Sequence, residues 1–220
     1  MRKLEIIHED EICLVINKPA GLAVQGGKDV GISLDKLLAE IRPPTAENMN
    51  VPLLVHRLDK DTSGLILTAK TKKAAAMFSR LFESKIIYRQ YFAVCLGKLK
   101  KNEGIIAMDL LIRGTAKKSE TRYKVIEKVQ GPEGMFFSVL ELELGTGRMH
   151  QIRRHFLMTG NPILGDDKYG DFAVNKKLKK TMGLKKLLLH ACRLVIVSKE
   201  DGLDLNLSAP VPEYFNVFRK

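Results

Sequence analysis

Short apolar segments with strand-like patterns follow one another through most of this chain, and they restrict the folds open to it. In residues 136–144, Leu140, Leu142 and Leu144 alternate with two glutamates, as in an antiparallel strand with one buried face. We predict further strands over residues 4–8, 12–17, 65–69, 88–96, 105–111, 120–129, 187–197 and 203–207. Helices are predicted over residues 33–41, after the N-cap Thr71, over 150–158 and 175–181, and briefly at the C-terminus. This pattern predicts an α+β fold around a largely antiparallel mixed sheet, flanked by helices and loops.

Nothing in the sequence divides the chain into separate parts. It has no internal repeat, no low-complexity tract and no linker long enough to separate two cores. The pair Pro43-Pro44 ends a predicted helix, and we expect a loop from there to Val51. Residues 1–220 are therefore expected to form a single domain.

Charge restricts the possible partners. The 37 Lys and Arg residues outnumber 25 acidic residues, which gives a net charge of +12. Such a field concentrates polyanions, so nucleic acid is favoured over an anionic membrane or a charge that only aids solubility. No apolar run approaches the ~20 residues of a membrane helix, and no signal peptide pattern is present. Cys13, Cys95 and Cys192 form no disulfide framework, so we expect a cytoplasmic protein.

Three clusters combine charged, hydroxyl and glycine residues, over positions 56–64, 147–155 and 162–170. The first lies between a predicted loop and a predicted strand, where a sheet can hold polar side chains for a site. A turn in which Thr62 and Ser63 bond the backbone explains this cluster equally well. The residues alone leave both interpretations open.

Other chemistries fit these clusters less well. A metal site at His150 and His155 is disfavoured, because ligands on one helical face are three or four residues apart and these are five apart. Asp59 and Asp61 could form a glycosidase pair, but their basic neighbours favour ionisation of both, whereas hydrolysis needs one protonated. Gly26-Gly27 is a weak phosphate-binding signal and is more often a turn. We predict no metal.

Residues 56–65, HRLDKDTSGL, closely resemble the signature of the RluA-type pseudouridine synthases, a family of RNA-modifying enzymes. Residues 17–21, NKPAG, match the first block of that family, and residues 147–153 and 162–170 match later blocks in the same order. The likeness runs from about Leu4 to Pro210. It implies the pseudouridine synthase catalytic fold and an enzyme that isomerises uridine to pseudouridine in RNA.

Shorter segments resemble the RluC branch, which modifies large-subunit ribosomal RNA. They are residues 23–27, 119–123, 166–171 and 183–191. Met149 stands where the family often has Thr, and Arg154 stands where a small apolar residue is common. Both departures lie beside the expected site and concern substrate preference. The S4-type RNA-binding domain that usually precedes the catalytic domain in this branch is not expected in this chain.

The resemblance assigns the essential carboxylate to Asp59, which acts at the ribose as a nucleophile or as a base through a glycal intermediate. It gives Arg153 the role of holding and orienting this carboxylate. It also assigns Tyr91 to stacking on the uracil, whereas the residues alone favour a strand aromatic packed in the core. Because the reaction is an isomerisation, no cofactor is expected.

Contacts to RNA are expected from basic and polar residues around the site. The resemblance implies that Arg57 fills the space left by the flipped uridine, although a surface arginine bonded to a turn is the plainer interpretation. Arg148, His150 and Gln151 are expected to bind substrate at the start of a basic helix. Clusters of lysines can hold further phosphates: Lys98, Lys100, Lys101, Lys117, Lys118, Lys176, Lys177, Lys179, Lys180, Lys185 and Lys186.

The predicted function is therefore isomerisation of specific uridines in large-subunit rRNA by a monomeric enzyme. One alternative is the same chemistry on tRNA or another RNA. The other is a non-enzymatic RNA-binding or ribosome-assembly protein, which explains the charge but gives no reason for the cluster around Asp59.

Overall fold

The computed structural model describes residues 4–27, 31–41 and 52–218, so the loop expected over 43–51 lies outside the described residues. The chain divides into two compact units. The first unit is Met1–Tyr88 with Ala191–Ala209, and the second is Arg89–His190 with Pro210–Lys220. Two strands, β5 (Ile87–Leu96) and β11 (Leu189–Ser198), contribute residues to both units.

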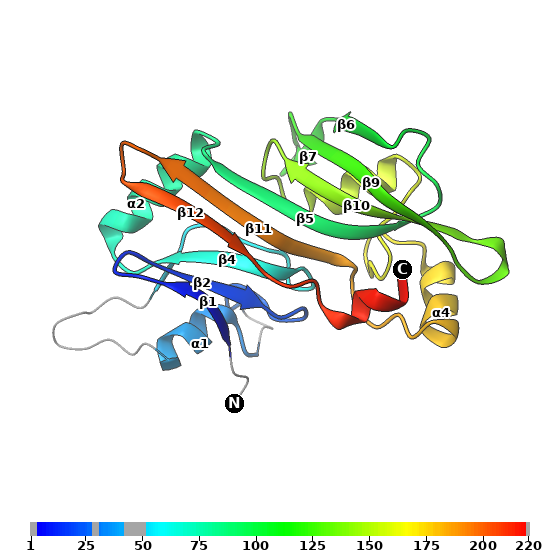
Figure 1. Ribbon diagram of the computed structural model, residues 1–220, viewed down its shortest axis with the longest axis horizontal. Coiled ribbons are helices and arrows are strands. Elements are labelled where there is room, and N and C mark those ends of the chain that lie inside the picture. The colour runs from blue at the N-terminus through cyan, green and yellow to red at the C-terminus, as the bar shows by residue number, and fades with distance from the viewer. Residues whose placement is uncertain (1–3, 28–30, 42–51, 219–220) are drawn as a thin grey trace. The chain divides into compact units, whose positions relative to one another are not determined.

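The first unit contains a sheet with the strand order β1-β2-β4-β11 (Figure 1). Its strands, besides β11, are β1 (Glu5–Glu9), β2 (Cys13–Lys18) and β4 (Ser63–Ala69), with β3 (Leu53–Leu54) beside β4 and β12 (Leu203–Ser208) beside β11. The pairs β1–β2, β2–β4 and β11–β12 are antiparallel. All residues of β4 are buried, so the cluster at 56–64 leads directly into the centre of this unit.

Two helices belong to the first unit, α1 (Leu34–Ile41) and α2 (Lys72–Glu83). The side chain of Thr71 accepts a hydrogen bond from the backbone N–H of Ala74 at 3.1 Å, which confirms the predicted N-cap. Ala74, Phe78 and Leu81 form one buried stripe of α2, as their helical spacing requires, and they share a hydrophobic core with β4.

The second unit contains the strand order β5-β10-β9-β6, with antiparallel pairs β5–β10, β10–β9 and β9–β6. The remaining elements of this unit include α3 (Gln151–Met158), α4 (Phe172–Thr181), and the 3-10 helices η1 (Pro132–Gly134) and η2 (Glu213–Phe218). The bounds of its other strands are β10 (Phe136–Leu144), β9 (Glu120–Gln130) and β6 (Glu103–Ala107). Antiparallel strand pairs combined with helices in both units confirm the α+β class.

Different helices pack on the two faces of the sheet in the second unit. On one face, Tyr123 of β9 packs edge-on against Phe156 of α3, with 6.2 Å between ring centroids. On the other face, Phe137 of β10 belongs to a core with Leu178 of α4 and Phe215 of η2. The alternation of side chains along a strand produces this division.

The structure corrects the predicted strand over residues 105–111. Its apolar pattern is divided between β6, which ends at Ala107, and β7 (Leu110–Ile112), which pairs with β8 (Thr115–Lys117) in a separate hairpin. Arg113 and Gly114 turn this hairpin with φ angles of 50° and 78°, as in a two-residue turn of type I′. The interruption depends on distant contacts, because Ser119 Oγ donates a hydrogen bond to the Met108 carbonyl at 2.5 Å.

Helix α4 begins three residues earlier than predicted, at Phe172. The side chain of Asp171 accepts a hydrogen bond from the backbone N–H of Val174 at 3.0 Å and so caps the helix there. Within the described residues, no helix is both long and apolar enough to cross a membrane.

Candidate active site

The loop that carries Asp59 connects β3 to β4 and is held at both ends. His56 Nε2 accepts a hydrogen bond from the backbone N–H of Leu67 at 2.8 Å, and its ring lies 4.7 Å from the ring of Phe82. The backbone N–H of Thr62 donates to the Asp59 carbonyl at 3.2 Å, which closes a turn. Asp59 is half-buried and Arg57 is exposed.

Lys18, from the first family-like block, lies fully buried beside this loop. Its Nζ donates to the carbonyls of Pro19 at 3.1 Å, Leu22 at 2.9 Å and Lys60 at 2.9 Å. Three acceptors match the three N–H groups of an ammonium, whereas a neutral amine has only two. The contact to Lys60 therefore fastens the end of β2 to the residue that follows Asp59.

The charge of Lys18 also affects the loop. Burial lowers its pKa to about 7, and the nearby charges of Asp61 and Asp59 act in the opposite direction. We conclude from the three carbonyl acceptors that the ammonium form is held in place. A buried cation thus lies near both carboxylates of the cluster.

Gly64, the last residue of the cluster at 56–64, stands at a position that only glycine can occupy. Its φ is +110°, and a Cβ placed there would lie 2.2 Å from the carbonyl oxygen of Ala191 in β11. A side chain at this position would push β4 and β11 apart, so the cluster needs glycine for both reasons.

In the second unit, Arg153 of α3 is held by a two-bond fork. Its side chain is buried, and its Nε and Nη2 donate to Asp166 Oδ2 and Oδ1 at 2.7 Å and 2.8 Å. A weaker bond of 3.4 Å runs from Nη2 to Asp167. Such a fork fixes the plane of the guanidinium.

The carboxylate that holds Arg153 is itself fixed. Asp166 Oδ1 accepts from the backbone N–H groups of Lys168 at 2.9 Å and Tyr169 at 2.8 Å. Burial acts to raise the pKa of Asp166, but the bonds from Arg153 and the two N–H groups outweigh it and hold the pKa below its usual value. The cluster at 162–170 therefore builds a rigid support for Arg153.

Tyr169 joins this support to the start of α3. Its hydroxyl lies 2.9 Å from His150 Nδ1, and its ring centroid lies 5.2 Å from Arg153 Cζ. The two later clusters are thus brought together at one place in the second unit. Arg148 is exposed next to them, and its Nε lies 3.4 Å from the carbonyl of Lys118.

Gln151 is buried, and both polar atoms of its side chain bond to the protein. Nε2 donates to the Glu120 carbonyl at 2.8 Å and to Thr121 Oγ1 at 3.1 Å. Oε1 accepts from Thr146 Oγ1 at 2.6 Å and from the Arg148 backbone at 3.0 Å. These contacts join α3 to β9.

Tyr91, also in this unit, is buried on β5 opposite Leu142 of β10.

Known proteins match this chain over the segments that carry these clusters. Residues 12–158 match the family model described as RNA pseudouridylate synthase, and they include Asp59, Tyr91 and Arg153. The chain belongs to this family. The synthase is therefore an isomerase that acts on RNA, as its sequence predicted.

Named relatives are similar over nearly all of the synthase. It is 36% identical over 222 residues to the ribosomal large subunit pseudouridine synthase C of Rickettsia felis, covering 96% of this chain and 68% of the relative. It is 35% identical over 217 residues to the protein of that name from Vibrio vulnificus, covering 94% of this chain and 66% of the relative.

Solved structures show the same fold. The structure of human RNA pseudouridylate synthase domain containing 4 matches with a TM-score of 0.77 and 25% identity, over 97% of this chain and 90% of that one. Human RNA pseudouridylate synthase domain containing 1 matches with a TM-score of 0.78 and 24% identity, over 98% and 86% of the two chains. The predicted pseudouridine synthase fold is confirmed.

The histidines of the synthase that suggested a metal site have other partners. His155 lies fully buried between Ser119 Oγ at 2.8 Å and Thr121 Oγ1 at 3.0 Å, and His150 contacts Tyr169. Among the described residues, a cluster of three metal-type ligands is formed by His8, Asp10 and Cys13, and it includes neither of these histidines.

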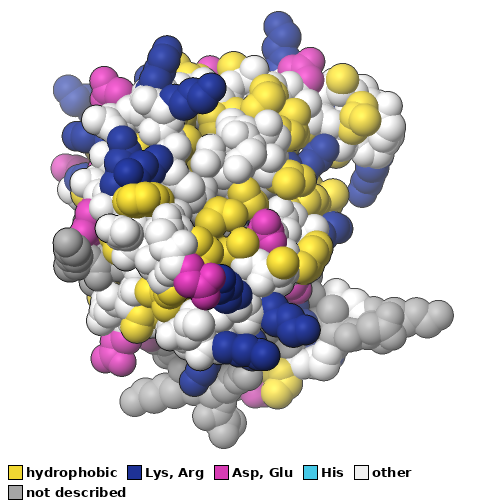
Figure 2. Space-filling view, turned by 90° about the vertical axis from the view of Figure 1, so that its right-hand side faces the viewer, with side chains coloured by type: hydrophobic (Ala, Val, Ile, Leu, Met, Phe, Trp, Pro, Cys, Tyr) yellow, Lys and Arg dark blue, Asp and Glu magenta, His cyan; other side chains and the backbone are white. Residues whose placement is uncertain are grey.

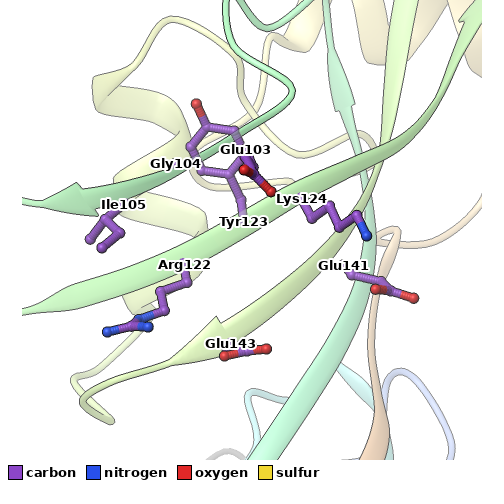
Figure 3. Close-up of a pocket in the computed structure, with 8 residues that line it drawn as sticks. All are labelled: Glu103, Gly104, Ile105, Arg122, Tyr123, Lys124, Glu141 and Glu143. Carbon is purple, nitrogen blue, oxygen red and sulfur yellow. The ribbon is translucent and has the colours of Figure 1, made fainter.

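A pocket of about 460 Å³ lies on β6, β9 and β10 of the synthase (Figure 3). Acidic and basic side chains alternate across its strands, since Glu141 lies opposite Lys124 and Lys124 opposite Glu103. None of the predicted site residues lines it. Its charges are paired across neighbouring strands, so we do not assign the active site to it.

The roles of Lys18, Asp166 and Tyr169 were not predicted from the sequence. All three lie inside the segments that resemble the family, so their positions carried a signal. Their roles depend on contacts with backbone groups and with Arg153, which only the folded chain brings together.

Proposed function

We propose that this synthase isomerises specific uridines of large-subunit ribosomal RNA, with Asp59 as the carboxylate that acts at the ribose. The observation that carries the proposal is the anchored loop that presents half-buried Asp59 beside the buried ammonium of Lys18. The rRNA substrate is inferred from the names of the Rickettsia and Vibrio relatives.

The reaction breaks the bond from ribose C1′ to uracil N1 and forms a bond from C1′ to C5. N1 gains a proton and C5 loses one, so atoms and charge balance without a co-reactant. Asp59 acts either by attack at C1′ or by removal of the C2′ proton to give a glycal, and both routes need a fixed carboxylate beside the ribose. A loop held through His56, Thr62 and Lys60 supplies this fixed position.

We assign to Arg153 the orientation of the Asp59 carboxylate, as the family resemblance implies. A guanidinium that must orient another group has to be rigid, and the fork to Asp166 supports this role. Tyr91 is proposed to stack on the uracil, and its burial on a strand of the sheet limits its freedom to move.

The target uridine has to leave its stack before Asp59 can reach the ribose, which costs a few kcal/mol in structured RNA. Arg57 is proposed to fill the vacated space, and its exposed position beside Asp59 supports this role. Arg148 and His150 are proposed to contact the substrate backbone. For Gln151 we propose a positioning role, because its amide is used in joining α3 to β9.

We further propose that residues 1–220 act as a single catalytic domain, as a monomer in the cytoplasm, where ribosomal RNA would be met. The likeness of nearly the whole chain to single named synthases supports one catalytic domain. Monomeric state and location rest on the family resemblance and the predicted substrate.

The test uses in vitro transcribed large-subunit rRNA, with pseudouridines mapped by carbodiimide labelling and primer extension. We expect new stops with the wild type and none with Asp59→Asn. Asp61→Asn is the matched control, since Asp61 lies two residues away in the same half-buried loop, and it should retain most activity. Equal stops with Asp59→Asn would refute the mechanism, stops only on tRNA would refute the substrate, and release of free uracil would indicate a hydrolase.

A further inference from the structure

Helix α4 presents a stripe to solvent that the proposed catalytic roles do not use. Phe172, Lys176, Lys179 and Lys180 stand at positions i, i+4, i+7 and i+8, and therefore lie on one face of the helix. The opposite side carries the core contacts, made by Leu178 and its neighbours. We call these four residues the α4 stripe.

The aromatic residue of the α4 stripe, Phe172, is exposed at the capped start of the helix. The side chain of Phe172 is 62% exposed, although Asp171 caps the helix at this point. Gly170 precedes the cap, and a Cβ there would lie 2.3 Å from the Asp166 carbonyl, so the backbone leading into α4 is tightly packed. An isolated exposed phenylalanine is ordinary on a protein surface, but this one stands at the head of a row of cations.

The lysines of the α4 stripe have no acidic partner among the described residues. Glu133 pairs with Lys177 of this helix, which lies outside the stripe. Lys176, Lys179 and Lys180 are all exposed. Figure 2 shows one face of the molecule, on which Lys and Arg side chains are interspersed with hydrophobic ones.

We propose that the α4 stripe binds unpaired RNA flanking the target uridine, with one base stacked on Phe172 and phosphates held by the three lysines. Sites for single strands combine a cationic track with an aromatic surface that accepts any base. The stripe extends over about 12 Å of helix, from the rise of 1.5 Å per residue. A protein partner is disfavoured, because a lone aromatic beside three unpaired lysines lacks the apolar centre of a protein interface.

The position of the stripe favours RNA that is already bound at the site. Phe172 follows Tyr169 by three residues, and Tyr169 contacts both His150 and Arg153. Lys168, exposed in the same loop, adds a further cation, with Nζ 5.5 Å from the Tyr169 ring. The proposal therefore rests on the proposed function, since it places flanking RNA next to the residues assigned to the substrate.

Binding is tested by fluorescence anisotropy with the full chain and two labelled probes, a 12-nucleotide unpaired RNA and a 12-base-pair RNA duplex. Phe172→Ala should raise the Kd for the unpaired probe by roughly fivefold to 150-fold, the range for loss of one stacked base. The Kd for the duplex should change much less, and Phe172→Trp should restore binding. The control is Ile126→Ala, which removes another exposed apolar side chain, on β9.

The lysines are tested through salt dependence. Replacing Lys176, Lys179 and Lys180 together by Gln should lower the slope of log Kd against log salt by about 2 units, at ~0.7 for each phosphate contact on a single strand. Lys177→Gln, which removes a lysine paired with Glu133, should leave the slope nearly unchanged. The Phe172→Ala slope should stay at the wild-type value, because stacking releases no counterions.

Three results would overturn this proposal: Phe172→Ala binding like Ile126→Ala, equal losses on the unpaired and duplex probes, or failure of Phe172→Trp to restore affinity. On rRNA transcript we expect Phe172→Ala to raise KM and leave kcat unchanged. If the wild-type protein forms no pseudouridine, the proposed function fails, whereas the binding comparison still decides the role of the stripe.

Discussion

At the scale of single residues, Lys18 shows how a buried charge can organise the loop that carries the proposed catalytic residue Asp59. Its ammonium spans three carbonyls, one of which belongs to the residue directly after Asp59. A side chain of similar length without a charge would leave these carbonyls without their donor. The position of Asp59 therefore depends on a residue far away in the sequence.

We expect Lys18→Met to lower the free energy of unfolding by about 2 kcal/mol, since buried carbonyls that lose a donor cost ~1–3 kcal/mol each and relief of the buried charge offsets part of this. It should also lower kcat, because the Asp59 loop loses an anchor. Urea unfolding and the rRNA assay would measure the two effects. Lys60→Met is the control, because the Lys60 side chain is exposed. Equal stability of Lys18→Met and wild type would contradict the anchoring role.

At the scale of elements, α3 is joined to β9 and to the corner before β7 by buried polar groups. His155 contacts Ser119 and Thr121, and Gln151 contacts Thr121 from one turn earlier in the same helix. Because α3 also carries Arg153, these bonds fix the helix that supports the proposed site. Polar contacts of this kind specify one arrangement of helix against sheet.

Burial lowers the pKa of His155 below its usual value of 6.5, with the charge of Arg154 acting in the same direction and a bond to Met108 opposing both. The unfolded chain therefore binds a proton at His155 more readily than the native protein does. The stability from neutral His155 is present above about pH 6.5 and is lost as the pH falls below it.

We accordingly expect the wild type to lose more stability than His155→Gln between pH 7.5 and pH 5.5, as measured by urea midpoints. His155→Gln itself should be less stable at pH 7.5, because it cannot reproduce both ring contacts. If the urea midpoints of the two proteins change with pH in parallel, protonation of His155 does not affect the stability of the fold.

At the scale of the whole molecule, a net charge of +12 attracts RNA of any sequence to the protein. This charge favours encounter but carries no sequence information. Under the proposed function, the groups near Asp59 and the structure of the RNA select the uridine.

Binding of wild-type protein to rRNA should weaken steeply with salt. If about six phosphates are contacted, raising KCl from 50 to 200 mM should raise Kd by roughly a thousandfold. Filter binding would measure this change, with a neutral osmolyte at matched osmolality as the control. A Kd that barely changes would mean that the net charge has little part in binding RNA.

The sequence by itself determined the family, the enzyme class and most of the elements. Local patterns were sufficient for these, as in the alternating leucines of β10 and the cap at Thr71. The order of the motif blocks was sufficient for the family, because each block is specific and depends on no distant contact.

Only the tertiary structure decided how Lys18, Gln151 and Asp166 are used. Each is polar and buried. Lys18 and Gln151 bond carbonyls of distant segments, and Asp166 accepts from backbone N–H groups of its own loop. It also decided the break between β6 and β7, where Ser119 bonds the Met108 carbonyl and turns an apolar run into a corner. A buried polar group needs hydrogen-bond partners close to it in space. The spacing of residues along the sequence does not tell which groups the fold brings close together.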